Sequence, residues 1–199
     1  MVGGVLLAAG MSTRFGGDKQ LAVFQGKTLL RCAAETLAEA PIDSAVAVLG
    51  PRADRHRQER AGLPFALVVN DETATGMSGS LIAGLTYLQT QDGPAQLDAV
   101  LVMVCDQPYC TPAHLRALVH TWRDSGKAIA ASRYAQVLGV PALFDRTVFA
   151  PLQALSGQRG AAHLIREREG EVAAVDFPAG VIDIDTQEDL QRLTHGSPP

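Results

Sequence analysis

The sequence predicts an α/β fold in which a mostly parallel central sheet carries helices on both faces. Three observations lead to this prediction. Apolar segments of strand length alternate along the chain with longer segments of helical periodicity. Most strand segments are continuously apolar, as strands buried on both faces are. The polar and glycine-rich candidates for a binding site follow directly after strand segments, and in parallel sheets ligands bind at the carboxyl ends of the strands.

Composition limits the class of protein. The chain has 199 residues, 47% of them hydrophobic, so we expect one domain over residues 1–194 and a disordered tail over 195–199. The net charge of −4 argues against general nucleic-acid binding. The three cysteines have neither zinc-site nor thioredoxin spacing, which favours a reducing compartment. Apolar runs are too short for a membrane span or a signal peptide, so we expect a cytoplasmic protein.

The first half of the chain is expected to contain four strands and three helices. Strands are predicted over residues 5–8, 45–49, 65–69 and 98–104. Helices are predicted over about 29–40, with Thr28 as the N-cap, over 52–60 and over about 76–89. The helix over 52–60 is highly charged, and we expect it, including His56, to lie on the surface.

The second half continues the alternation. Thr111 and Pro112 are typical of the N-cap and first residue of a helix. Strands are predicted over 129–132, 140–144, 172–175 and 181–184, and helices over about 147–155 and 161–168. Thr186 begins the last helix, and Asp189 completes a capping box with it.

The segment from Gly10 to Lys19 is a candidate phosphate-binding loop. Small residues follow the first strand, so backbone N–H groups can point at an anion, and Arg14 and Lys19 supply positive charge. A Walker loop has four residues between its glycines and Ser or Thr after the lysine, whereas here five residues separate Gly10 from Gly16 and Gln20 follows Lys19. The glycines do not fit a dinucleotide fingerprint either. A plain solvated turn remains an alternative.

Asp106 is a candidate metal ligand. It follows the most apolar strand, where an ionised carboxylate is costly unless it is paired or bound to a metal. Pro108 then turns the chain away. Capping or an ordinary salt bridge would also explain an aspartate here. The cationic glycine loop at the same sheet edge favours Mg²⁺ coordination.

These motifs together resemble the nucleotidyltransferases of molybdenum-cofactor maturation. Residues 7–19 are similar to the signature L-A-A-G-x-S-x-R-x-G-x-x-K of that family. Further matches follow in the family's order: Asn70, G-M-S-G-S-L at 76–81, C-D-Q-P at 105–108, G-V-P at 139–141 and D-I-D-T-Q-E-D-L at 183–190. The resemblance covers nearly the whole chain and implies a three-layer, Rossmann-like nucleotidyltransferase fold.

The resemblance implies transfer of CMP from CTP to the terminal phosphate of molybdopterin, with release of pyrophosphate and with Mg²⁺ as cofactor. In that reaction Arg14 and Lys19 would hold the triphosphate, and Asp106 would hold the metal. Asp185 is the second candidate metal ligand, although an N-terminal capping role explains it equally well, and Asp183 is a weaker candidate. The candidate nucleotide contacts are Ala8, Ala9, Gly10, Ser12, Arg14, Lys19, Asn70, Ser78 and Ser80. Helix capping is the alternative role for Ser78 and Ser80.

The resemblance leaves base and acceptor open. The Ala-Ala-Gly form at residues 8–10 is similar to the cytidylyltransferase branch, which uses CTP. GTP is the alternative nucleotide donor. The family often has Gly-His-Pro where this chain has Gly139-Val140-Pro141, and Gln158 stands where the family has an acid. A sugar or polyol phosphate is therefore an alternative acceptor, and His163 is a candidate to face it. A non-catalytic carrier that delivers cofactor to a molybdoenzyme is a further alternative, and such an enzyme is an implied partner.

Overall fold

A seven-stranded central sheet organises the molecule, with strand order β5-β4-β1-β6-β8-β7-β9. The computed structural model describes residues 1–71, 76–91 and 96–195. The strands are β1 (Val2–Ala8), β4 (Ser44–Leu49), β5 (Ala66–Val69), β6 (Ala99–Val104), β7 (Ile129–Tyr134), β8 (Val137–Asp145) and β9 (Val172–Asp176). A separate hairpin pairs β2 (Val23–Phe24) with β3 (Lys27–Thr28). All strand pairs in the central sheet are parallel except the two that β8 makes, with β6 and β7.

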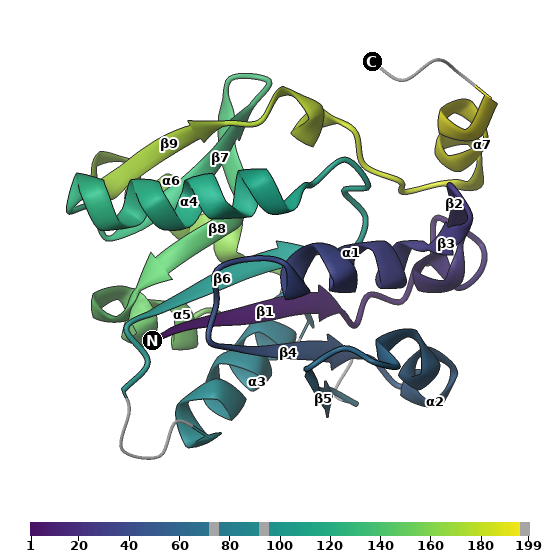
Figure 1. Cartoon of the computed structure of the whole chain (residues 1–199), viewed down its shortest axis with the longest axis horizontal. Coiled ribbons are helices and arrows are strands. Elements are labelled where there is room, and N and C mark those ends of the chain that lie inside the picture. The colour runs from purple at the N-terminus through teal and green to yellow at the C-terminus, as the bar shows by residue number, and fades with distance from the viewer. Residues whose placement is uncertain (72–75, 92–95, 196–199) are drawn as a thin grey trace.

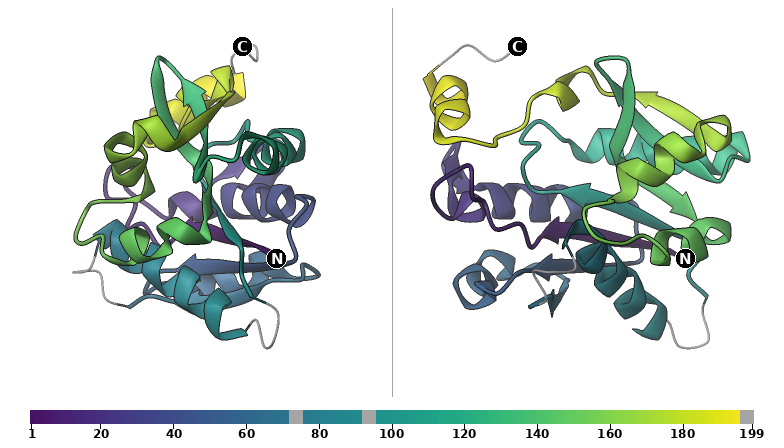
Figure 2. Two further views of the ribbon diagram at one scale, coloured as in Figure 1. Left: turned by 90° about the vertical axis from the view of Figure 1, so that its left-hand side faces the viewer. Right: turned by 180° about the vertical axis from the view of Figure 1, so that it is seen from behind.

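Helices cover both faces of the sheet and give the three layers seen in Figures 1 and 2. One face carries α1 (Leu29–Ala38) and α4 (Pro112–Ser125), and the other carries α3 (Gly76–Gln91), α5 (Phe149–Gln153) and α6 (Ala161–Glu167). The short α2 (Ala53–His56) follows the carboxyl end of β4, and the last helix α7 (Gln187–His195) lies beside the β2–β3 hairpin. None of the described helices is long and apolar enough to cross a membrane.

The alternation of side chains along β1 explains the two cores. Val5 packs with α3 on one face, whereas Leu6 packs with α1 on the other, and both are fully buried. A third, smaller core joins Phe15, Phe24, Leu29 and Ile184. This small core links the glycine loop to the segment before α7.

Most predicted elements are confirmed. Thr28 and Thr111 accept the N-capping hydrogen bonds of α1 and α4, and Thr186 and Asp189 form the predicted capping box. The predicted tail begins inside α7, which extends to His195, and the rest of that tail lies outside the described residues.

Three predictions about elements were wrong in whole or in part, and one element was missed. Residues 181–184 form no strand: a 3-10 turn covers Pro178–Val181, and the Ile184 N–H donates to the Asp106 carbonyl at 2.9 Å. The predicted helix over 52–60 divides into α2 and a 3-10 turn at Arg57–Arg60. The predicted helix over 147–155 is likewise a 3-10 turn, Arg146–Val148, followed by α5. The β2–β3 hairpin was missed, although Gln25 and Gly26 both have the positive φ that two-residue hairpin turns require.

Candidate active site

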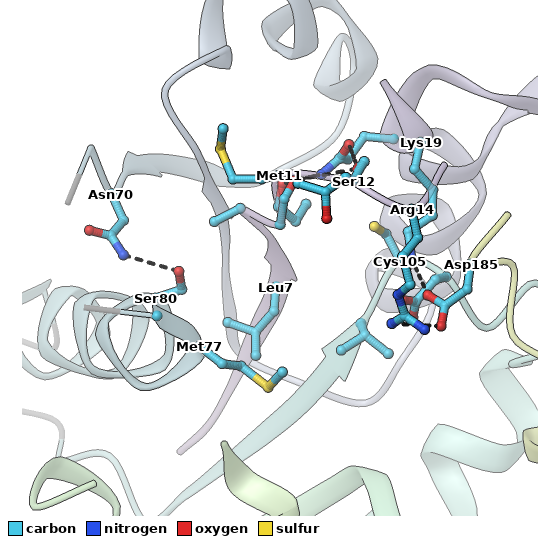
Figure 3. Close-up of a pocket in the computed structure, with 18 of the residues that line it drawn as sticks. Leu7, Met11, Ser12, Arg14, Lys19, Asn70, Met77, Ser80, Cys105 and Asp185 are labelled. Carbon is cyan, nitrogen blue, oxygen red and sulfur yellow. Dashed lines mark hydrogen bonds and ion pairs between the residues drawn. The ribbon is translucent and has the colours of Figure 1, made fainter. Parts of the chain in front are cut away.

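The carboxyl ends of β1, β5 and β6 border a cavity of about 440 Å³. Its charged end contains Arg14, Lys19, Asp106 and Asp185. Asn70 and Ser80 lie at the opposite end from Arg14, Lys19 and Asp185 (Figure 3). The remaining lining comes from the glycine loop, the start of α3 and Gln158. The parallel arrangement thus brings segments far apart in the sequence to one edge of the sheet, as predicted.

Lys19 is the centre of the charged end. Its Nζ lies 2.8 Å from Asp106 Oδ2 and 3.0 Å from Asp185 Oδ1, and its side chain is only 12% exposed. Burial alone would lower the pKa of Lys19, but the charges and hydrogen bonds of the two aspartates outweigh it and raise the pKa. Lys19 therefore carries a full positive charge at neutral pH.

Asp185 reaches the site from the far end of the chain. The hydrogen bond from the Ile184 N–H to the Asp106 carbonyl places the two aspartates side by side. The exposed Arg14 extends from the glycine loop and pairs with Asp185 at 3.0 Å. Thr186 is the N-cap of α7 and Asp189 completes the capping box, so the alternative capping role of Asp185 does not hold.

Asp183 lies next to this cluster but does not line the cavity. Burial raises the pKa of its carboxyl group, and the negative charges of Asp185 and Asp106 raise it further. Asp185 therefore has the better position of the two for a ligand in the cavity.

The donor set fits a divalent cation with oxygen ligands. Asp106 and Asp185 both direct a carboxylate oxygen at the Lys19 ammonium, and the second oxygen of Asp185 faces Arg14. Carboxylates are the ligands that Mg²⁺ and Mn²⁺ prefer, and both ions commonly bind through one or two carboxylates plus phosphates. No cluster of three or more His, Cys, Asp or Glu side chains suited to a metal occurs among the described residues. A metal here would therefore need phosphate oxygens and a displaced Lys19.

The opposite end of the cavity is neutral and polar. Asn70, which follows β5, donates from Nδ2 to Ser80 Oγ on α3 at 3.1 Å (Figure 3). Because the Ser80 oxygen accepts this bond, its own proton is available to an acceptor. Met77 lines the cavity between the two ends and is half exposed. Such an end suits a heterocyclic base better than it suits a phosphate.

Ser78 occupies a different place from the one predicted. It is buried, it is not among the residues that line the cavity, and its Oγ donates to the Gly157 carbonyl at 3.0 Å. A nucleotide contact by Ser78 stays a prediction that this position does not favour. The hydroxyl ties the start of α3 to the loop that carries Gln158.

The two departures from the family pattern have different surroundings. Gln158 lines the cavity, so the replacement of an acid removes a negative charge from its wall. Gly139 does not line it, and a Cβ at Gly139 would lie 2.3 Å from the Tyr134 hydroxyl oxygen. Gly139 therefore makes room for Tyr134. His163 is also outside the lining and pairs with Glu167 at 3.1 Å.

Sequence reasoning missed two buried polar groups around the loop. Gln20 is 3% exposed and bonds to the loop backbone. His56 is equally buried, and its Nε2 lies 2.8 Å from Asp18 Oδ1, so the expectation of a surface histidine was wrong. His56 is the last residue of α2, and its imidazole points toward the loop that carries Asp18. The only sign of these contacts in the sequence was the pair of polar residues that flank Lys19, Asp18 and Gln20.

This arrangement defines a class of protein: an α/β nucleotidyltransferase, with a glycine loop, two cations and two carboxylates at one sheet edge. A comparison with family models gives the particular family. Residues 4–172 match the MobA-like NTP transferase domain, and the chain belongs to that family.

Relatives in this family carry different names. The chain is 32% identical to a nicotine blue oxidoreductase of Paenarthrobacter nicotinovorans, over 96% of each chain. It is 33% identical to a probable molybdenum cofactor guanylyltransferase of Chloroflexus aggregans, covering 77% of this chain and 70% of that one. Among solved structures, Rv0371c of Mycobacterium tuberculosis is 32% identical, with a TM-score of 0.80 and coverage of 98% of both chains. Rv0371c has also been solved in complex with manganese.

Proposed function

We propose that this chain transfers a nucleoside monophosphate from a nucleoside triphosphate to the terminal phosphate of a molybdopterin-type acceptor and releases pyrophosphate. The observation that carries this proposal is Lys19, held between Asp106 and Asp185 at the mouth of the glycine-loop cavity. A cation and two carboxylates at one point suit a site that must hold several phosphates together with a divalent ion.

The reaction needs charge neutralisation more than proton transfer. A phosphate oxygen of the acceptor attacks the α-phosphorus, and the bond from that phosphorus to the pyrophosphate oxygen breaks. The nucleophile is already an anion, so no general base is required. Lys19 and Arg14 would bind the triphosphate and neutralise charge that develops on the leaving pyrophosphate.

A bound divalent ion would neutralise further phosphate charge, and Asp106 and Asp185 are the residues that would hold it. Mg²⁺ is our first candidate. The manganese complex of Rv0371c supports a divalent cation in a related protein without deciding between the two metals.

CTP is our first candidate for the nucleotide because residues 8–10 read Ala-Ala-Gly. GTP is the alternative, and the relatives named guanylyltransferase favour it. The polar pair Asn70 and Ser80 would face the base in either case.

The test is a nucleotide panel. The protein is incubated with Mg²⁺, molybdopterin and α-labelled CTP, GTP or ATP, and pyrophosphate release and labelled product are measured. We expect product mainly with CTP. A preference for GTP would overturn the base assignment, and absence of product with every nucleotide would overturn molybdopterin as the acceptor. A parallel screen of sugar and polyol phosphates then identifies transfer to another acceptor.

Asp106→Asn separates an enzyme from a carrier. We expect turnover to fall by at least about a hundredfold while the circular dichroism spectrum is retained, because the variant keeps the shape and loses the charge. Asp124→Asn, on α4, is the matched control. A variant that still supports delivery of cofactor to an apo-molybdoenzyme, without turnover, would favour the carrier function.

The relative named nicotine blue oxidoreductase motivates a second candidate function, an oxidoreductase reaction. Its assay follows the absorbance of NADH or NADPH with a quinone-type dye as acceptor. The charged end of the cavity matches a triphosphate, and for this reason we place nucleotidyl transfer first.

A further inference from the structure

Gln20 forms a three-point clasp on the glycine loop. Its Nε2 donates to the Ala8 carbonyl at 3.1 Å and to the Gly10 carbonyl at 2.7 Å. Its Oε1 accepts from the Ser12 hydroxyl at 3.0 Å. The side chain is 3% exposed, so water does not compete strongly for these bonds. One amide thus engages three positions of a five-residue segment.

The clasp turns backbone carbonyl groups of the loop and backbone N–H groups of the loop in different directions. Two carbonyls are turned toward Gln20, whereas the backbone N–H groups of residues 10–14 donate to no protein acceptor within the described part of the chain. A Cβ placed on Gly10 would meet no protein atom within 4 Å, so the space above that glycine is open. Ser12 also has a φ of +54°, an uncommon conformation for a residue other than glycine. Its hydrogen bond to Gln20 helps to hold it there.

We propose that Gln20 is a positioning residue for the triphosphate: it holds the loop carbonyls inward, so that the loop N–H groups face the phosphates. The proposal rests on the nucleotidyltransferase function above. Gln20 itself gives its amide to the protein and contacts no phosphate. Since Gln20 directly follows Lys19 within the 3-10 turn Lys19–Leu21, the clasp also fixes where the lysine leaves the loop.

The chemistry of the clasp selects the informative substitutions. Gln20→Met keeps the length and volume of the side chain and removes all three hydrogen bonds. Gln20→Glu keeps the shape and replaces the donor with a second acceptor, which would face two carbonyl oxygens. Both variants should allow the loop to turn its carbonyls toward the phosphates.

The experiment measures the dissociation constant of inorganic tripolyphosphate with Mg²⁺ by calorimetry, for the full chain and each variant. We expect Gln20→Met and Gln20→Glu to bind on the order of tenfold or more weakly, as the loss of oriented N–H contacts predicts. In the transfer assay the effect should fall on KM for the nucleotide, with kcat at saturation changed little.

Ser12→Ala tests the clasp as a unit. This variant removes one of the three bonds and should weaken tripolyphosphate binding by a smaller factor. The double variant Ser12→Ala with Gln20→Met should bind no more weakly than Gln20→Met alone, because the serine acts through the glutamine. An additive double variant would overturn the clasp.

Two controls separate positioning from general destabilisation. Gln153→Met makes the same chemical change on the exposed surface of α5, where Gln153 bonds to Gln89. Leu152→Ala destabilises the core under α5, away from the loop. Both should keep the wild-type dissociation constant. Equal binding by Gln20→Met and the wild type would overturn this inference alone, whereas a wild-type protein that binds neither tripolyphosphate nor any nucleoside triphosphate would overturn the proposed function with it.

Discussion

His114 is a buried histidine on α4 that the proposed chemistry does not use. Its ring stacks on Phe177, with the ring centroids 4.4 Å apart, and its Nε2 lies 2.7 Å from Ser132 Oγ. Ser132 donates its own proton to the Pro141 carbonyl, so the imidazole must be the donor to Ser132. Burial lowers the pKa of His114 to about 4. The folded protein therefore holds this side chain neutral.

This histidine should make the protein less stable in acid. Between about pH 6.5 and pH 4 the unfolded chain binds a proton at His114 that the folded chain does not. The free energy of unfolding should therefore fall by about 2 kcal/mol across this range, a value that allows for partial screening by solvent. His114→Gln, which does not titrate, should lose that part of the pH dependence.

Urea unfolding of both proteins at pH 7 and pH 4.5 provides the measurement. Contributions from other groups cancel in the difference between them. An identical pH dependence for the variant and the wild type would contradict the prediction. His120→Gln, at an exposed position of the same helix, is the matched control for loss of a histidine.

At the residue scale, the sequence predicted which side chains carry charge into the site better than which ones support it. Lys19, Arg14 and Asp106 could be placed because each follows a strand at a known edge of a parallel sheet. Gln20 and His56 could not, because their burial depends on contacts with the loop fold itself. Asp185 was an open alternative until the Ile184–Asp106 hydrogen bond resolved its position.

At the scale of elements, the start of α3 packs closely against the loop that precedes α6. Gly76 has a φ of +65°, and a Cβ there would lie 2.5 Å from the Gly157 carbonyl oxygen. Gly157 has a similar φ of +60°, but a Cβ there would meet nothing within 4 Å. A comparison of Gly76 with Gly157 therefore distinguishes the energetic cost of the left-handed backbone conformation from the cost of close packing.

Alanine at these two glycines should therefore have unequal effects. Gly157→Ala should lower the free energy of unfolding by about 1–2 kcal/mol, the cost of a left-handed conformation with a side chain. Gly76→Ala should lower it by about 1–3 kcal/mol more, because backbone has to move. Since Gly76 and Met77 line the cavity, only Gly76→Ala should also raise the nucleotide KM. Denaturant unfolding and steady-state kinetics test both points, and equal losses for the two variants would refute the close-packing argument.

The antiparallel direction of β8 is a feature that the sequence did not predict. A strand was predicted at 140–144, but its direction was not. Ala135 and Gln136, the two residues between β7 and β8, have φ of +46° and +65° and form a tight turn, which can join only antiparallel strands. Neither residue is glycine, asparagine or aspartate, so the sequence contained no conventional sign of a hairpin.

For the whole molecule, the position of Lys19 predicts cooperation between metal and triphosphate. A divalent ion at Asp106 and Asp185 has to displace the ammonium, and a triphosphate offers Lys19 new partners. Each ligand should therefore strengthen binding of the other. Mg²⁺ alone should raise the Tm little, whereas Mg²⁺ with tripolyphosphate near a hundred times its Kd should raise it by about 5–10 °C.

Thermal unfolding with each ligand alone and with both together provides the comparison. Asp106→Asn should lose the cooperative part of the Tm increase and keep the part due to tripolyphosphate. A shift with Mg²⁺ alone that equals the shift with both ligands would show that Lys19 does not compete with the metal.

The overall architecture was largely predictable because it follows from periodicity, whereas the connections between elements were not. Continuous apolar runs such as residues 99–104 identify buried parallel strands, and the three layers follow from the alternation with helices. The segment after β9 was predicted as another strand from its apolar composition. Its apolar residues instead serve the small core around Phe15 and the packing beside Tyr134, which only the tertiary structure determines.

The late position of Asp185 in the chain has a consequence for biosynthesis. On the ribosome, every strand of the central sheet and the loop with Lys19 emerge before the segment that follows β9. The nascent chain can therefore complete its sheet while Lys19 still has only Asp106 as a partner. The second carboxylate follows the last strand of the sheet, and it reaches Lys19 when Ile184 docks against Asp106 and Phe15. The charged cluster can therefore be completed only after every strand of the central sheet has been synthesised.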